Sequence, residues 1–298
     1  MKLVTWNIQW CRGCDGRVDP ARIVAQARAL ADFDVLCLQE VASNFPALAG
    51  SSGENQFELL AALLPGYTAV RGVAVDVAAP NGQRREFGNM ILSRYPVTQV
   101  QRILLPWPSD PAVRSMPRLL LDATVETPFG LLRVMTTHLE YYSAAQRAAQ
   151  VEALRGHHAE AAGHTRNDRP HDTSGGPFHS RPQAAAAILT GDFNFRPEDP
   201  LRARIAAPFD DPDVPPLDDV WQQLRPGEPH AHTSGVHDRA QWPESFACDF
   251  VFATRDLRER LRSIAVDAVT DASDHQPIVV DIGEGAVERT SDAGDRSP

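Results

Sequence analysis

The sequence predicts an α+β fold in which two mixed, largely antiparallel sheets pack face to face with helices outside, a four-layer αββα sandwich. Three observations lead to this prediction. The chain opens with a strand, a helix and a second strand, its middle consists of consecutive apolar runs of strand length, and helical segments stand at both ends of those runs. With 298 residues, 43% of them hydrophobic, the chain can fill one large domain or two small ones.

The first part of the chain predicts strand, helix, strand and helix in turn. Residues 3–8 and 34–40 are apolar at most positions, which is typical of strands buried on both faces. Between them, residues 20–31 carry apolar side chains at helical spacing, namely Ile23, Val24, Ala27 and Leu30. A second helix is expected over residues 56–64.

The rest of the chain predicts nine further strands and two helices. The middle strands have hairpin spacing, so this part is expected to be largely antiparallel; they cover residues 67–77, 87–93, 97–105, 119–126 and 131–138. An alanine-rich helix is expected over residues 143–162 and a short helix over residues 197–205. The last strands are expected over residues 185–191, 246–253, 264–269 and 278–282.

Composition along the chain predicts a single domain over residues 1–282. Residues 163–182 are rich in Gly, Pro, Ser, Asp, Arg and His without periodicity, and the strand pattern resumes directly after them, so they are expected to form a mobile insertion within that domain. Residues 283–298 are polar and charged, and we expect a disordered tail there.

The charged residues exclude several classes of protein. Twenty-nine basic against thirty-nine acidic residues give a net charge of −10, which argues against a uniformly basic nucleic-acid-binding surface but allows a local basic groove. Lys2 is the only lysine, so the chain has neither a P-loop lysine nor a buried amine for a Schiff base. The patterns GxSxG, HExxH and GxGxxG are also missing.

The location expected from the sequence is the cytoplasm. The apolar run after Met1 is too short for the core of a signal peptide, and no run approaches the ~20 apolar residues of a membrane span. We therefore expect a soluble protein without a transmembrane segment. No feature indicates an obligate protein partner.

The four cysteines leave one alternative chemistry open. Cys11 and Cys14 form a CxxC pair, but no second CxxC exists and no helix opens directly after this one, so we favour loop cysteines without chemistry. The alternative is a zinc or redox protein built on this pair and the histidine loop of His230, His232 and His237. Because zinc needs three or four ligands and nothing fixes the others, we expect that loop to lie beside a substrate cleft instead.

Polar residues at the ends of apolar strands are the central observation. The set comprises Asn7, Glu40, His138, Asp192, Asn194, Asp249, Asp274 and His275. Any one of them alone is explained as a residue that caps a strand or shapes a turn. Together they supply carboxylates for a hard cation, imidazoles for proton transfer and amides that orient oxygen atoms, a combination that favours Mg²⁺ or Mn²⁺.

These residues lie in six short motifs that resemble the endonuclease/exonuclease/phosphatase superfamily, which includes deoxyribonucleases of the pancreatic type, neutral sphingomyelinases, apurinic endonucleases and inositol polyphosphate phosphatases. The motifs occur in the order of the family, from residue 3 to about 282. They are Thr5-Trp6-Asn7, Leu38-Gln39-Glu40-Val41, Thr137-His138-Leu139, Gly191-Asp192-Phe193-Asn194, Cys248-Asp249-Phe250-Val251-Phe252 and Ser273-Asp274-His275-Gln276-Pro277.

The resemblance implies a metal site and a phosphate site. Glu40 would be the principal ligand of the metal, and Asp274 would lie near it. Asn7 would help to position the metal, the phosphate or the attacking water. Arg118 resembles the family arginine that reaches a phosphate oxygen, while a surface arginine is an equally good explanation of the same residue.

The resemblance also implies the residues that carry the reaction. Asp249 would orient His275 through one ring nitrogen and leave the other for the phosphate oxygen or the water. Asp192 and Asn194 would flank the water and the scissile phosphate. His138 stands where deoxyribonuclease-like and sphingomyelinase-like members have histidine and apurinic endonucleases have tyrosine, so the sequence departs from the latter branch.

The function expected on this basis is hydrolysis of a phosphoester, most simply a nuclease or other phosphodiesterase acting by in-line attack of water with Mg²⁺ or Mn²⁺ as cofactor. The partner is then a phosphodiester substrate, with nucleic acid as one candidate. One alternative is a sphingomyelinase-like phosphodiesterase of phospholipids or small molecules, and another is a non-catalytic binding protein. The sequence shows neither a stacking platform of aromatic residues next to arginines, as extended strand binding would need, nor a membrane-docking hairpin.

Overall fold

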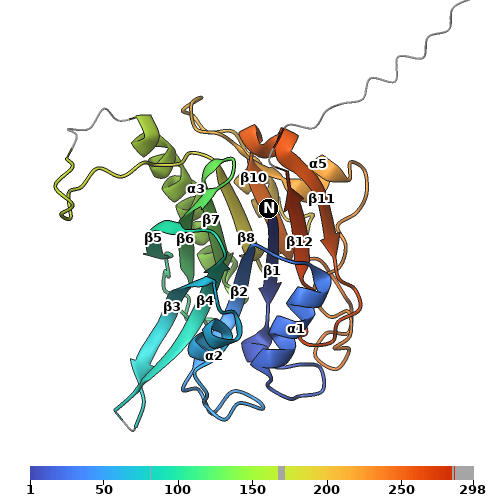
Figure 1. Cartoon of the computed structure of the whole chain (residues 1–298). Helices are drawn as coiled ribbons and strands as arrows, with labels where there is room; N and C mark the ends of the chain where they lie inside the picture. Colours follow the sequence, from blue (N-terminus) through green and yellow to red (C-terminus); the bar gives the residue numbers. More distant parts are fainter. Residues whose placement is uncertain (81, 167–171, 284, 286–298) are drawn as a thin grey trace, which may run out of the picture.

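Two six-stranded sheets form the centre of the molecule (Figure 1). The computed structural model describes residues 1–80, 82–166, 172–283 and 285. One sheet has the order β11-β12-β1-β2-β4-β3, with bounds Leu261–Val266, Ile278–Ile282, Lys2–Asn7, Val35–Ser43, Arg84–Ser93 and Thr68–Ala78. The other has the order β5-β6-β7-β8-β10-β9, with bounds Val97–Leu104, Leu119–Thr127, Gly130–His138, Ala187–Asp192, Asp249–Thr254 and Leu217–Asp219.

Alternating apolar side chains hold the two sheets together. Leu3, Val35 and Ile91 of the first sheet belong to one buried cluster with Val134 and Ile188 of the second. Because successive side chains of a strand point to opposite faces, the neighbouring residues of each strand face outward toward helices. The sheets thus pack face to face through the inner set.

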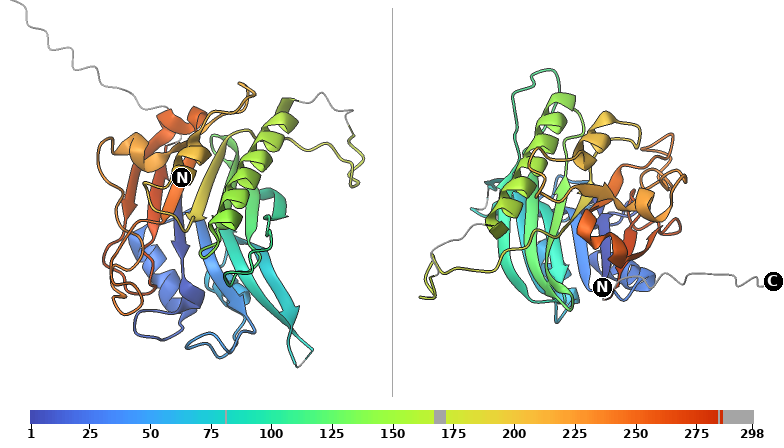
Figure 2. Two further views of the ribbon diagram at one scale, coloured as in Figure 1. Left: turned by 180° about the vertical axis from the view of Figure 1, so that it is seen from behind. Right: turned by 90° about the horizontal axis from the view of Figure 1, so that it is seen from above.

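Helices cover the outer face of each sheet. They are α1 (Pro20–Leu30) and α2 (Gln56–Leu63) on the first sheet, and α3 (Ala144–Arg166) and α4 (Pro200–Ala206) on the second. α5 (Val220–Leu224) instead packs against β10 and β11, and its Val220 and Trp221 belong to the cluster between the sheets. α1 and α2 lie in front of the first sheet in Figure 1, and α3 lies in front of the second sheet after a half turn in Figure 2. The prediction of an α+β sandwich with helices outside is confirmed.

Local sequence signals explain where the first helices begin. Asp19 precedes α1 and accepts a hydrogen bond from the backbone N–H of Arg22, while Pro20 occupies the first turn, where no N–H partner is needed. Asn55 caps α2 in the same way, through the backbone N–H of Glu58. Both helices therefore begin at or next to the predicted residues.

The structure differs from the expected elements mainly between residues 206 and 248. β9 and α5 were not predicted, because three strand residues and five helical residues after a proline pair are too short to show periodicity. The segment 246–248 precedes β10 instead of belonging to it. Of the expected insertion, residues 163–166 continue α3 and 167–171 lie outside the described residues; of the expected tail, only 283 and 285 are described.

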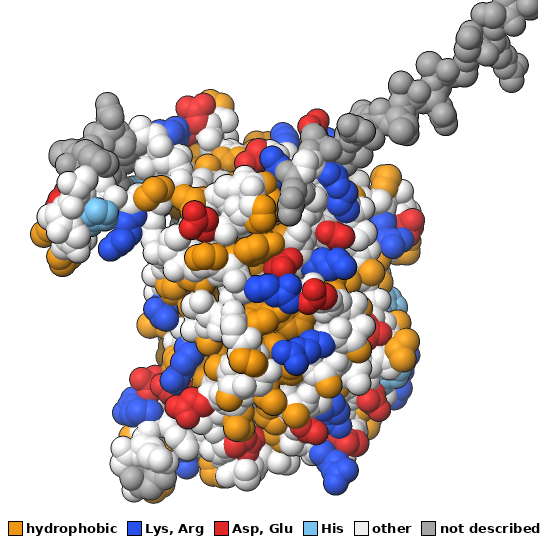
Figure 3. Space-filling model, in the orientation of Figure 1, with side chains coloured by type: hydrophobic (Ala, Val, Ile, Leu, Met, Phe, Trp, Pro, Cys, Tyr) orange, Lys and Arg blue, Asp and Glu red, His pale blue; other side chains and the backbone are white. Residues whose placement is uncertain are grey.

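Two features of the surface bear on earlier expectations. Within the described ranges, no helix is long and apolar enough to cross a membrane. Acidic and basic side chains alternate over the face seen in Figure 3 and do not gather in one basic patch, in keeping with the net charge of −10.

Candidate active site

The ends of four central strands from both sheets meet at one place. β1 pairs with β2 and β7 pairs with β8 in parallel, so each pair ends on the same side. His138 and Asp192 are direct partners in the second pair. Asn7 at the end of β1 connects the sheets, because its Nδ2 donates to Glu40 Oε1 at 3.3 Å and to Asp192 Oδ2 at 3.0 Å.

A β-bulge places Glu40 in this centre. The pairing of β2 with β4 shifts register between Leu38 and Val41, and Glu40 adopts a φ of 61°, which is uncommon for a residue other than glycine. Burial in the cleft and the neighbouring carboxylate of Asp274 raise the pKa of Glu40 to about 7. The bulge therefore points a carboxyl group into a site where its charge is poorly compensated.

Gly191 allows the second strand pair to approach closely at the same level. Its φ is +142°, and a Cβ atom there would lie 1.9 Å from the carbonyl oxygen of Thr137. Only glycine fits this contact. The next residues along both strands are His138 and Asp192, so the glycine sets the distance between two site residues.

His138 lies between the carboxylates of the two sheets. Its Nδ1 is 3.8 Å from Glu40 Oε1, and its Nε2 is 3.5 Å from Asp192 Oδ2. Burial, followed by the positive charges of Arg118 and His275, lowers the pKa of His138 well below its usual value. The imidazole is therefore neutral at neutral pH and can act as a hydrogen-bond donor and acceptor.

The surroundings of His275 shift its pKa upward, in the opposite direction to the shift of His138. Burial alone would lower the pKa of His275, but the carboxylates around it, Asp249 first, raise it well above the usual value. Its Nδ1 donates to Asp249 Oδ2 at 2.8 Å, which leaves Nε2 facing Asp192 Oδ2 at 3.7 Å. Burial and the charge of Asp249 raise the pKa of Asp192 to about 6. A charged imidazolium thus stands beside a carboxylate that can take up a proton near neutral pH.

Asn194 is fixed next to Asp192 by two hydrogen bonds. Its backbone N–H donates to Asp192 Oδ1 at 2.9 Å, and its side-chain Nδ2 donates to the carbonyl oxygen of Leu139 at 2.9 Å. The residue has a φ of 53°, a conformation that asparagine tolerates better than most residues. The structure therefore brings Asn194 to the site, as its place after β8 indicated.

Arg118 is buried, so the explanation of this residue as a surface arginine is wrong. Its side chain is 7% exposed, and Nε donates to Glu140 Oε2 at 3.3 Å. Its Nη1 is buried and has no hydrogen-bond partner among the described residues. The charge of Arg118 helps to lower the pKa of His138, so the guanidinium belongs to the electrostatic surroundings of the centre.

Asp274 is held by two residues that the sequence analysis did not find. Gln241 Nε2 donates to Asp274 Oδ2 at 3.1 Å, and Trp242 Nε1 donates to the same oxygen at 3.2 Å. Both lie in the loop before β10, in a segment without periodicity or a family motif. A polar residue in such a loop gives no sequence signal, because only the tertiary structure brings it to the strand ends.

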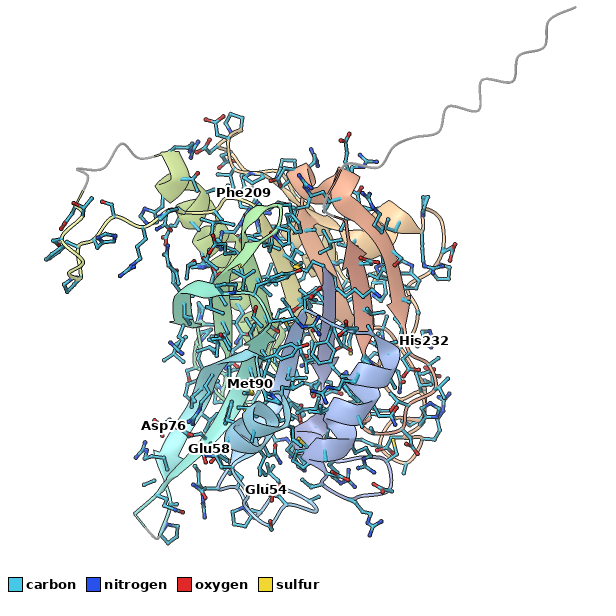
Figure 4. The ribbon with its side chains drawn as sticks, viewed as in Figure 1. Glu54, Glu58, Asp76, Met90, Phe209 and His232 are labelled. Carbon is cyan, nitrogen blue, oxygen red and sulfur yellow. The ribbon has the colours of Figure 1, made fainter. Side chains whose placement is uncertain are left out.

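The histidine loop does not converge on a common ligand. His230 Nε2 lies 2.9 Å from Asp219 Oδ2, His232 Nδ1 lies 2.8 Å from Ser245 Oγ, and His237 Nε2 lies 2.9 Å from the carbonyl oxygen of Ala268. His230 and His232 line a cavity of about 840 Å³, and His232 reaches the edge of the molecule in Figure 4. The loop thus lies beside a cleft.

The CxxC pair shows no redox or zinc geometry. Cys11 is buried, and burial raises the pKa of its thiol well above the usual value. Cys14 Sγ donates to the carbonyl oxygen of Ser273 at 3.5 Å.

In the part of the chain that the structure describes, one group of possible ligands has atoms within 4.8 Å of one another, namely Asp192, Cys248 and His275. Burial raises the pKa of Cys248 as well, which disfavours the thiolate that a metal requires.

Comparisons with known proteins identify the family of the chain. The family model described as "Endonuclease/Exonuclease/phosphatase family" matches residues 4–275. No curated protein matches the chain. Among solved structures, an endonuclease/exonuclease/phosphatase from Beutenbergia cavernae is 28% identical with a TM-score of 0.63, covering 96% of this chain and 72% of the other.

Two further solved structures share the fold at lower identity. Mannosyl-6-phosphatase from Bacteroides thetaiotaomicron is 17% identical with a TM-score of 0.62, covering 95% of this chain and 99% of the other. D. rerio TDP2 complexed with single strand DNA product is 21% identical with a TM-score of 0.61, covering 94% and 97%. At these identities the likeness concerns the fold alone.

Proposed function

Because the chain belongs to the endonuclease/exonuclease/phosphatase family, a family of phosphoester hydrolases, we propose that it is a divalent-metal-dependent phosphodiesterase, most simply a nuclease. The observation that carries the proposal is the bridge from Glu40 through Asn7 to Asp192, with one neutral and one charged imidazole beside it. This arrangement separates a place for a cation from a place for an attacking water.

The donor atoms at Glu40 fit a hard divalent cation. Glu40, Asp192 and Asp274 lie close enough for their charges to act on one another, and among the described residues none of the three is ion-paired with an arginine. Their unbalanced negative charge is what a cation would neutralise. Glu40, with Asn7 and Asp274, would hold Mg²⁺ or Mn²⁺, which would polarise a phosphoryl oxygen and stabilise the charge that develops on it.

Other residues of the chain bind the phosphate, orient the attacking water and accept its proton. The free Nη1 of Arg118 binds a non-bridging oxygen of the phosphate. Asp192, with its pKa of about 6, accepts a proton from the attacking water, and Asn194 orients that water.

The charged His275 donates from Nε2 to a phosphate oxygen, while Asp249 holds its ring through Nδ1. Water attacks phosphorus and gives its proton to Asp192, while the P–O bond to the ester oxygen breaks and that oxygen takes up a proton from solvent, so no covalent enzyme intermediate forms.

An activity panel tests this proposal. Plasmid DNA, single-stranded DNA, RNA, sphingomyelin and a synthetic phosphodiester are incubated with Mg²⁺, with Mn²⁺ and with excess EDTA. We expect cleavage of at least one phosphodiester that depends on the cation, and loss of that cleavage in Glu40→Gln. Glu58→Gln is the matched control, because Glu58 is exposed on α2 (Figure 4). Cleavage of sphingomyelin alone would instead favour a lipid phosphodiesterase, and no cleavage of any diester contradicts the proposal.

A further inference from the structure

Four aromatic side chains form an unbroken row beside the catalytic centre. We call Tyr142, Tyr141, Trp242 and Phe246 the aromatic ridge. Neighbouring ring centroids along it are 4.8, 5.9 and 5.5 Å apart, all in edge-to-face contact. Tyr141 and Tyr142 are 41% and 43% exposed, which places them among the exposed large hydrophobic side chains of the molecule. The ridge thus exposes aromatic surface to solvent that does not pack in the hydrophobic core.

Arginines stand at both ends of the ridge. The guanidinium of Arg114 lies 4.5 Å over the ring of Tyr142, and that of Arg196 lies 4.9 Å over the ring of Phe246. Neither arginine forms an ion pair within the described part of the chain, whereas eleven other arginines do; Arg114 also donates to the hydroxyl of Tyr142. Planar cations on aromatic faces are well suited to anionic ligands that also stack.

A cavity joins the ridge to the catalytic residues. It has a volume of about 560 Å³ and is lined by Tyr141, Trp242, Phe246 and Arg196 together with Asn194. Cavities of this size hold small organic ligands. Trp242 belongs to both parts, because its ring lies in the ridge and its Nε1 donates to Asp274. A ligand group in this cavity is therefore next to the phosphate that the centre would cleave.

We propose that the aromatic ridge stacks unpaired nucleobases, so that the substrate is a single-stranded oligonucleotide. This inference rests on the proposed function and names its substrate class. A strand of nucleic acid combines flat aromatic groups with a regular series of negative charges, and the ridge combines exposed rings with guanidinium groups that form no ion pair among the described residues. In addition, Asn194, Gln241 and Glu244 line the same cavity and offer donors and acceptors for the edge of a base.

The ridge also corrects an expectation from the sequence. No stretch of the sequence combines several aromatic residues with arginines, because the participants come from residues 114, 141–142, 196 and 242–246. Four separate loops bring them together at the strand ends. The stacking surface is therefore a product of the fold and gives no local signal.

A binding titration tests the inference independently of turnover. Two labelled oligomers of equal length are compared by fluorescence anisotropy in excess EDTA: oligothymidylate, and an oligomer with abasic sugars in place of the nucleosides. The backbone charge is the same, so the difference reports the bases. We expect oligothymidylate to bind about tenfold more tightly, and Tyr141→Ala to remove about tenfold of its affinity without changing that of the abasic oligomer.

Phe178→Ala is the matched control, because Phe178 is 88% exposed but lies in the segment after α3, outside the ridge. This variant should bind both oligomers as the wild type does. Equal affinity for the two oligomers overturns the inference, and so does Tyr141→Ala with an unchanged melting temperature and unchanged binding.

Competition by mannose 6-phosphate as strong as that by thymidine 5′-phosphate also overturns it, in favour of a sugar phosphate. Base-dependent binding without cleavage of any diester would contradict only the proposed function, whereas cation-dependent cleavage without base-dependent binding would contradict only this inference.

Discussion

Replacing Glu40 by glutamine should stabilise the metal-free protein at alkaline pH while removing its response to Mg²⁺. The pKa of Glu40 rises from 4.5 to about 7 on folding, because burial and the Asp274 carboxylate disfavour its charge. A carboxyl group with a raised pKa contributes full stability below the unfolded value, and that contribution is lost as the pH rises through the folded value. The wild type therefore loses stability between about pH 4.5 and 7, and glutamine, which cannot ionise, does not.

The size of the effect follows from the shift. Each pKa unit corresponds to about 1.4 kcal/mol, so ionised Glu40 costs up to about 3 kcal/mol above pH 7. Because the side chain is 18% exposed, solvent lowers this figure somewhat. We expect the variant to melt at the same temperature as the wild type near pH 4.5, and a few degrees higher at pH 8.

Thermal unfolding in EDTA at both pH values measures this difference directly. Mg²⁺ added at pH 8 should raise the melting temperature of the wild type and leave that of Glu40→Gln nearly unchanged. Glu58→Gln, on the exposed face of α2, should behave as the wild type under all conditions. The reasoning is refuted if Glu40→Gln melts below the wild type at pH 8, or if the two differ equally at both pH values.

Three other substitutions test single parts of the site. Asp249→Asn should lower kcat by a large factor, up to the ~10⁴-fold seen for the comparable change in a serine protease triad, with little change in KM; a kcat within a few-fold of wild type would show that Asp249 only ends a strand. His138→Ala should lower kcat and remove an inflection on the acidic limb of the pH profile, because burial lowers the pKa of His138 and the neutral imidazole is the form that can both donate and accept hydrogen bonds; an unchanged profile would show that its protonation state does not matter to the reaction. Gly191→Ala should lower the melting temperature strongly, since its Cβ would lie 1.9 Å from the Thr137 carbonyl oxygen, and a stable, fully active variant would show that the two strands can separate at no cost.

The spacing of apolar residues and the polar residues at the ends of apolar runs predicted the framework of this site. Both signals lie within short stretches of sequence, so no tertiary contact is needed to recognise them. The apolar runs before Asn7 and Asp192 predicted strands that the structure contains, and parallel pairing then placed both residues on one side. Helical spacing of apolar residues likewise predicted a helix over residues 20–31, and α1 covers Pro20–Leu30. In these places the local preference and the tertiary structure agree.

Features that depend on tertiary contacts could not be predicted from the sequence. The bulge at Glu40 arises from the pairing of β2 with β4, and the burial of Arg118 arises from its ion pair with Glu140. Gln241 and Trp242 bind Asp274 from a loop more than 30 residues earlier in the chain. Each of these features joins segments that are far apart in sequence, so no window of neighbouring residues contains the signal.

The central claim is that the chain cleaves a phosphodiester with a cation held at Glu40. The most direct test is the initial rate of cleavage of a phosphodiester substrate as a function of Mg²⁺ concentration, measured for the wild type and for Glu40→Gln after both have been treated with EDTA. We predict a saturable rise from no activity in the wild type, and a rate in the variant that stays near zero or needs far more Mg²⁺. Full activity of the wild type in excess EDTA, or the same Mg²⁺ dependence in both proteins, would contradict the claim.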